Sequence, residues 1–148
     1  MQLGAGRLTR SHLKGDPFTA KSLKALEEYI EDQIEPLARS LATFEKDVAA
    51  GTSKTFRTLA KLAQNLYPKL GAHLTLDALD QIVPEIQSLD IDQRIELPGV
   101  SMERAHQLVA GSMVARQLMR TLNLKEIRIC PWALREGIVL HRLDWIER

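Results

Sequence analysis

The sequence contains a single cysteine, Cys130, in 148 residues, which excludes an intramolecular disulfide and is typical of a reducing compartment. No run comes near the roughly 18 consecutive apolar residues of a membrane-spanning helix, so we expect a soluble, cytoplasmic protein with no membrane partner. Neither sign of charge predominates, because the chain has 20 basic and 19 acidic residues and a net charge of +1. General nucleic-acid binders need a concentrated basic surface, so nucleic acid is not an expected partner and any anion site must be local.

Recognisable catalytic motifs are missing as well. A Walker A loop needs glycine directly before Lys-Ser/Thr and again five residues earlier, and here Ser53 and Val48 occupy those positions. The four histidines are far apart and lack metal-ligand spacing, so we expect no zinc site. There is no Gly-x-Ser-x-Gly elbow, and the nearby pair Asp77 and Asp80 is explained by charge at a helix start. We therefore assign no catalytic residue and no metal ligand to this chain.

Hydrophobic residues at spacings of three and four cover most of the chain and predict helices. The expected helices span residues 7–14, 16–41, 56–67, 75–89, 101–122 and 132–143, with a helical turn at 90–95. Asp16 is the expected N-cap of the second helix, with Pro17 at its first position. Pro36 is expected to kink or split that helix, because proline removes a backbone hydrogen bond.

Two short strands are expected, at residues 47–50 and 125–130, and each is followed by a helix. This order predicts a single helix-rich α/β domain over residues 1–148 with few parallel strands. A sheet of two or three short strands is smaller than usual, and residues 1–6 resemble the end of a strand. We therefore expect that part of the sheet belongs to a longer protein that begins upstream.

The segment Gly51-Thr52-Ser53-Lys54-Thr55 lies between a predicted strand and a predicted helix. Backbone N–H groups at a helix start favour an anion, as does the helix dipole. The segment adds three hydroxyl groups, and basic residues continue along one side of the helix: Lys54, Arg57 and Lys61. The alternative is that Thr52 or Ser53 only caps the helix, and the local pattern alone favours this alternative because short motifs often match by chance.

A pair of charged residues and a glycine inside a predicted helix also indicate possible roles. Arg135 and Glu136 follow the C-terminal end of the second predicted strand, where ligands of open α/β sheets bind, but a surface ion pair explains them equally well. Gly111 lies inside the 101–122 helix at a cost of about 1 kcal/mol relative to alanine. We expect a neighbouring element to approach closely there.

Four stretches in the same order resemble the exopolyphosphatase and guanosine pentaphosphate phosphatase (Ppx/GppA) family. They are LGAGRLTR (3–10), GTSKTFRTLAKLA (51–63), RIELPGVSMERAHQLVAGSMV (94–114) and IRICPWALREG (127–137). The resemblance implies the actin-like ATPase superfamily, with two ribonuclease H-like lobes and a cleft between them. It also implies hydrolysis of terminal phosphoanhydride bonds, usually with Mg²⁺.

The resemblance begins at the end of a strand in the second lobe, so the chain is interpreted as a truncated second lobe. The first lobe, with the catalytic glutamate, and the acidic metal ligands would lie outside this chain. Mg²⁺ is therefore implied for the full-length enzyme and not expected in this fragment. By the same resemblance the expected partners are polyphosphate or guanosine pentaphosphate and the missing first lobe. An exposed sheet edge and apolar face also predict self-association as a homodimer or larger homo-oligomer.

The resemblance changes the interpretation of the segment from Gly51 to Thr55, which becomes a phosphate-binding wall facing the cleft. Arg7, in the Gly-Ala-x-Arg-Leu-Thr segment, becomes a second phosphate contact, and Arg135 and Glu136 are expected to support the cleft. His106 departs from the aspartate common in the family and is given no role. The alternatives are a non-catalytic phosphate- or polyphosphate-binding module and a helical interaction domain without a ligand. The isolated chain is expected to be inactive.

Overall fold

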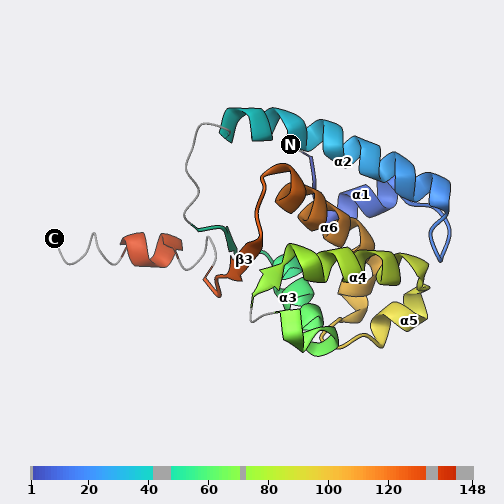
Figure 1. The fold of residues 1–148 in the computed structure, drawn as a ribbon. Coiled ribbons are helices and arrows are strands. Elements are labelled where there is room, and N and C mark those ends of the chain that lie inside the picture. Colours follow the sequence, from blue (N-terminus) through green and yellow to red (C-terminus); the bar gives the residue numbers. More distant parts are fainter. Residues whose placement is uncertain (1, 42–47, 71–72, 133–136, 143–148) are drawn as a thin grey trace.

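The computed structural model describes residues 2–41, 48–70, 73–132 and 137–142 (Figure 1). Their elements are α1 (Ala5–His12), α2 (Ala20–Leu41), β1 (Ala50–Gly51), α3 (Lys54–Leu66), a 3-10 turn (Pro68–Leu70), β2 (Leu74–Thr75), α4 (Leu76–Ser88), α5 (Ile91–Ile95), α6 (Met102–Thr121) and β3 (Glu126–Ile129). Residues 137–142 are also helical. The predicted helices are therefore present, with small differences at their ends, and only part of the predicted 132–143 helix lies within the described residues.

The strands form a three-stranded sheet in the order β1-β3-β2, at one end of the helical body (Figure 1). β1 pairs parallel to β3, with Gly51 opposite Ile129, as the strand–helix order predicts. β2 pairs antiparallel to β3, with Leu74 opposite Ile127, so the sheet is mixed where only parallel strands were expected. β2 was missed because a strand of two residues is too short to show alternation.

α6 is the central helix and packs against α1, α2, α3, α4 and α5. It is surrounded on several sides, and its buried positions include small residues that let neighbouring backbones approach: Ala105, Ala110, Gly111, Ser112 and Ala115. Ser101 occupies its N-cap position, but the side chain makes no capping hydrogen bond. The core therefore lies around α6 rather than on the small sheet.

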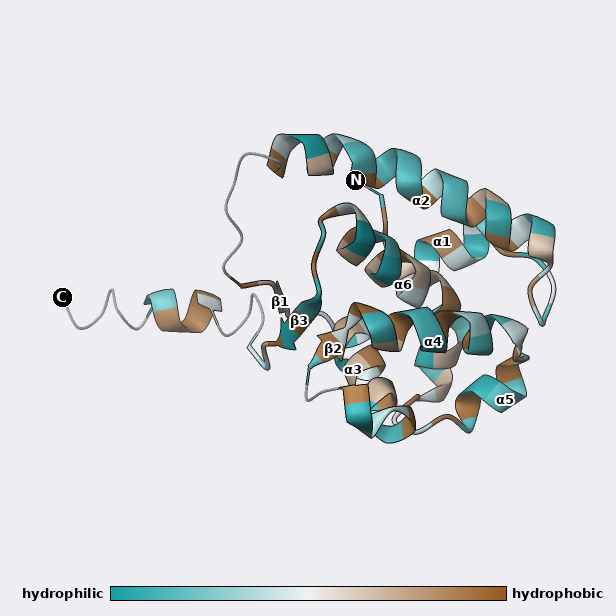
Figure 2. Cartoon of the chain, in the orientation of Figure 1, coloured by the Kyte–Doolittle hydropathy of each residue, from teal (hydrophilic) through white to brown (hydrophobic). Residues whose placement is uncertain are grey.

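α2 covers this core with one face. Its buried residues recur every four positions, namely Ser22, Leu26, Ile30 and Ile34, while its other side is largely hydrophilic (Figure 2). α2 extends through Pro36 to Leu41, so the predicted split at the proline does not occur. Burial of the periodic face stabilises the helix enough to tolerate the missing hydrogen bond.

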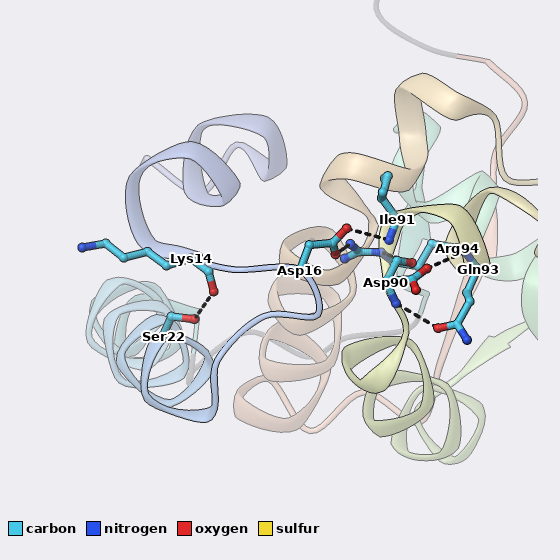
Figure 3. Close-up of polar contacts among 7 residues, drawn as sticks. All are labelled: Lys14, Asp16, Ser22, Asp90, Ile91, Gln93 and Arg94. Carbon is cyan, nitrogen blue, oxygen red and sulfur yellow. Dashed lines mark hydrogen bonds and ion pairs between the residues drawn. The ribbon is translucent and has the colours of Figure 1, made fainter.

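Asp16 does not cap α2, and that prediction was wrong. α2 begins at Ala20, and Thr19 Oγ1 accepts the hydrogen bond from the backbone N–H of Ser22 at 3.2 Å. Asp16 instead accepts a hydrogen bond from the backbone N–H of Ile91 at 2.8 Å and forms an ion pair with Arg94 (Figure 3). The Asp16 carboxylate thus links the turn before α2 to α5, although the two are far apart in sequence.

Arg94 is the buried partner in this contact, with 1% of its side chain exposed. Its Nε donates to the carbonyl of Asp90 at 3.2 Å, and its guanidinium lies 4.6 Å from the centre of the Phe18 ring. Burial lowers the pKa of Arg94, and the charges of Asp16 and Asp90 oppose that shift. The charge is thus held inside the fold by carboxylate, carbonyl and aromatic groups from two segments.

Candidate functional site

The starts of α1 and α3 meet at Gly111 of α6. A Cβ atom built on Gly111 would lie 2.7 Å from Thr55 Cγ2 and 3.3 Å from Ala5 Cβ. The predicted close approach at this glycine is confirmed, and two helices make it rather than one. The structure thereby brings the helix that carries Arg7 next to the segment Gly51–Thr55.

Gly51 ends β1 and is buried under the start of α3. Its carbonyl accepts a hydrogen bond from the backbone N–H of Cys130 at 3.0 Å. A Cβ atom built on Gly51 would lie 2.9 Å from Ile127 Cγ2 and 2.9 Å from Phe56 Cγ. In the described part of the chain, positive φ occurs at Gly15, Gly99 and Asn123, so packing rather than backbone conformation requires glycine at 51.

Ser53 is the N-cap of α3, so the simpler interpretation of the segment is correct for this residue. Its Oγ accepts a hydrogen bond from the backbone N–H of Phe56 at 3.2 Å. This cap uses one first-turn N–H group, and those of Lys54 and Thr55 have no partner within a helix of this geometry. Capping and anion binding are therefore compatible at this helix start.

The candidate side chains differ in exposure. Arg7, Thr52, Ser53 and Lys54 are exposed, whereas Thr55 is half-buried with its methyl group against Gly111. Arg135 and Glu136 lie outside the described residues. Exposed hydroxyl and cationic groups thus surround the start of α3, and Thr55 holds that start against α6.

A surface pocket of about 370 Å³ lies between α3 and the start of α6. We call it the α3–α6 groove, and its lining residues are Lys54, Arg57, Thr58, Lys61, Gly99, Ser101, Glu103 and Arg104. Sequence reasoning found the α3 cations but missed Arg104. The turn-forming residues Pro98 and Gly99 before α6 are a local signal that the chain changes direction there, but they do not indicate which helix it then meets.

The described residues contain no group of three or more His, Cys, Asp or Glu side chains that could hold a metal ion. They also contain no helix long and apolar enough to cross a membrane. Cys130 is half-buried after β3. The described arrangement gathers exposed cationic and hydroxyl side chains at the start of α3.

A family model described as the Ppx/GppA phosphatase family matches residues 1–145. The chain belongs to this family. Exopolyphosphatase 1 of Mycobacterium tuberculosis is 41% identical over 149 aligned residues, which cover 97% of this chain and 43% of that protein. The guanosine-5'-triphosphate,3'-diphosphate pyrophosphatase of Photobacterium profundum is 21% identical and is covered over 29% of its length.

Solved structures of Ppx/GppA proteins share the fold. The Aquifex aeolicus family member matches 100% of this chain and 49% of its own, with a TM-score of 0.85 and 23% identity. An exopolyphosphatase from Cytophaga hutchinsonii matches with a TM-score of 0.81 and 21% identity. The helix-rich fold with a small sheet is therefore part of the actin-like ATPase fold of the Ppx/GppA family. The chain spans half or less of the length of these relatives.

Proposed function

We propose that this chain is part of an exopolyphosphatase-type phosphatase and forms one wall of its phosphate-binding cleft. The reaction would be hydrolysis of terminal phosphoanhydride bonds of inorganic polyphosphate or guanosine pentaphosphate. Membership of the Ppx/GppA phosphatase family supports the reaction class. The observation that carries the cleft-wall role is the meeting of the starts of α1 and α3 at Gly111.

Two helix starts side by side favour an anion more than one does, because both present free N–H groups and positive dipole ends. Gly4, the N-cap of α1, has no side chain with which to occupy those groups. Arg7 and Lys54 add exposed positive charge in the first turns of the two helices. Phosphate oxygens bound here would be oriented by backbone groups that need no rearrangement.

The described residues do not fit a magnesium site, because they lack a cluster of carboxylate or histidine ligands. We therefore derive no step through Mg²⁺ for this chain. Its proposed contribution is to hold and orient phosphate groups, and the attacking water and its base would be supplied from elsewhere in a longer protein.

The first prediction is that the isolated chain does not hydrolyse polyphosphate. Attack on a phosphoanhydride needs a positioned base and usually a cation, and the described residues contain no cluster of ligands that could hold the cation. Phosphate release from polyphosphate should stay at the level of a blank, with or without Mg²⁺. Turnover that survives purification and disappears in Lys54→Ala would contradict this prediction.

The second prediction is that inorganic phosphate binds weakly at the Gly51–Thr55 segment. Backbone amide signals of these residues should shift in a phosphate titration followed by nuclear magnetic resonance. Lys54→Ala should raise the Kd about threefold and reduce its salt dependence, because an exposed charge contact contributes at most about 1 kcal/mol. The control is Lys24→Ala, which removes an exposed charge on α2. Signals from 51–55 that do not move at millimolar phosphate would refute the site.

A second candidate function is an interaction domain. The observation that favours it is a set of exposed apolar side chains near the end of the chain: Trp132, Ile138, Val139 and Leu140. β1 is also an edge strand of the described sheet, and unpaired edges recruit other strands. We propose that this surface binds the rest of a longer protein or, in its absence, a second copy, which sedimentation at high concentration would detect.

A further inference from the structure

α3 concentrates positive charge without any compensating acid. Its 13 residues contain no aspartate or glutamate, and its cations are Lys54, Arg57 and Lys61. None of the three forms an ion pair with another residue that the structure describes. On α2, by contrast, Lys24 and Arg39 each pair with a glutamate four residues away. In a chain with a net charge of +1, this side of α3 is a local exception.

The α3 cations lie on the same side of the helix and line the α3–α6 groove. Lys61 lies seven positions after Lys54, which corresponds to about 10 Å along a helix axis. The groove therefore extends well beyond the Gly51–Thr55 segment, to which only Lys54 belongs. A single phosphate group at that segment leaves Arg57 and Lys61 without a ligand.

The loop before α6 shapes the far end of the groove. Gly99 has a φ of +78°, and a Cβ atom built on it would lie 3.1 Å from Lys61 Cδ. The stem of Lys61 is thus packed against the loop. Arg104, with 21% of its side chain exposed, contributes a fourth cation. Its Nη2 lies 3.9 Å from Oε1 of Glu103, which is the one acid among the lining residues. Glu103 thus partly compensates Arg104, but the three α3 cations have no such partner among the described residues. They repel one another, and an anionic ligand relieves that repulsion.

We infer that the α3–α6 groove is a second anion subsite, which holds the internal phosphates of a linear polyphosphate whose end lies at the Gly51–Thr55 segment. This inference rests on the proposed function. It makes Arg57, Lys61 and Arg104 determinants of chain-length preference. Guanosine pentaphosphate carries at most three phosphates in a row, so one end of it cannot occupy both the segment and the far end of the groove.

A nucleic acid is a poorer fit to the same charges. Sites for single-stranded nucleic acid combine a basic groove with aromatic side chains that stack on bases. The residues lining the α3–α6 groove include no aromatic side chain. The groove therefore offers positive charge for phosphate groups but no aromatic surface on which a nucleobase could stack. This combination fits a chain of phosphates without nucleosides.

The test compares the binding of long and short phosphate chains to the 148-residue chain. Arg57→Ala/Lys61→Ala should raise the Kd for polyphosphate of about 45 units roughly tenfold, and should make the slope of log Kd against log salt shallower by about 1.4, or 0.7 for each lost contact. The Kd for tripolyphosphate should change less than about twofold. The matched control is Lys24→Ala/Arg39→Ala, which removes one lysine and one arginine charge from exposed positions on α2.

Equal weakening by the groove and control variants would overturn the subsite, as would equal weakening for long and short chains. An RNA oligonucleotide of similar charge that binds as tightly as polyphosphate would overturn the choice of ligand.

The phosphate titration of the Gly51–Thr55 segment distinguishes a failure of this subsite from a failure of the proposed cleft wall. If those amides shift but the double variant has no effect, the subsite fails and the proposed function stands. If they do not shift and long-chain binding still depends on Arg57 and Lys61, the cleft wall fails and the groove stands.

Discussion

Asp16→Ala should destabilise the fold by about 3 kcal/mol, the lower end of the cost of breaking a buried ion pair. The variant leaves Arg94, which is 1% exposed, without its carboxylate partner and also removes the acceptor for the backbone N–H of Ile91. The lower end applies because Asp16 itself keeps 34% of its side chain exposed. Urea unfolding followed by circular dichroism measures the change.

The double variant Asp16→Ala/Arg94→Met separates the charge effect from the loss of packing. Methionine fills part of the arginine volume without a charge, so the double variant should recover much of the lost stability. Asp92→Ala is the matched control, because it removes an exposed carboxylate in the first turn of α5. If Asp16→Ala costs less than about 1 kcal/mol, like an exposed pair, the ion pair does not hold the turn before α2 to α5.

Gly111→Ala should destabilise the chain by about 2 kcal/mol, although alanine is the better helix former by about 1 kcal/mol. Its Cβ atom would lie 2.7 Å from Thr55 Cγ2, so Thr55 and the start of α3 would have to shift away from α6. Because both helix starts form the proposed phosphate site, the variant should also reduce the phosphate-dependent shifts of residues 51–55. Thermal unfolding and the phosphate titration give the two measurements.

Thr55→Ser supplies the matched rescue for Gly111→Ala. Serine lacks the Cγ2 methyl group that the new Cβ atom would meet, so the double variant should be more stable than Gly111→Ala alone. Ala5 would still lie 3.3 Å away, so the rescue should be partial. A double variant as unstable as Gly111→Ala would show that Thr55 is not the contact that matters.

Local sequence signals predicted most of the secondary structure. The helix predicted over residues 75–89 is α4, and Thr75 caps it, since its Oγ1 accepts a hydrogen bond from the backbone N–H of Ala78 at 3.2 Å. Alternation predicted β3, in which Ile127 is buried. These predictions succeeded because caps, helical spacing and alternation depend on residues within a few positions of one another. The motifs also indicated the family, which the match to the Ppx/GppA model confirms.

Tertiary structure decided what those residues do together. The sequence predicted that Asp16 caps a helix, but its carboxylate instead pairs with Arg94, which lies 78 positions away. The pairing forms because the buried positive charge of Arg94 needs a negatively charged partner. Gly111 was expected to admit one neighbour, and it admits two helix starts whose meeting no local pattern encodes. The groove likewise needs Arg104 from α6 beside cations from α3. Contacts between distant residues depend on how helices pack around α6, and packing is a property of the whole core rather than of any one segment.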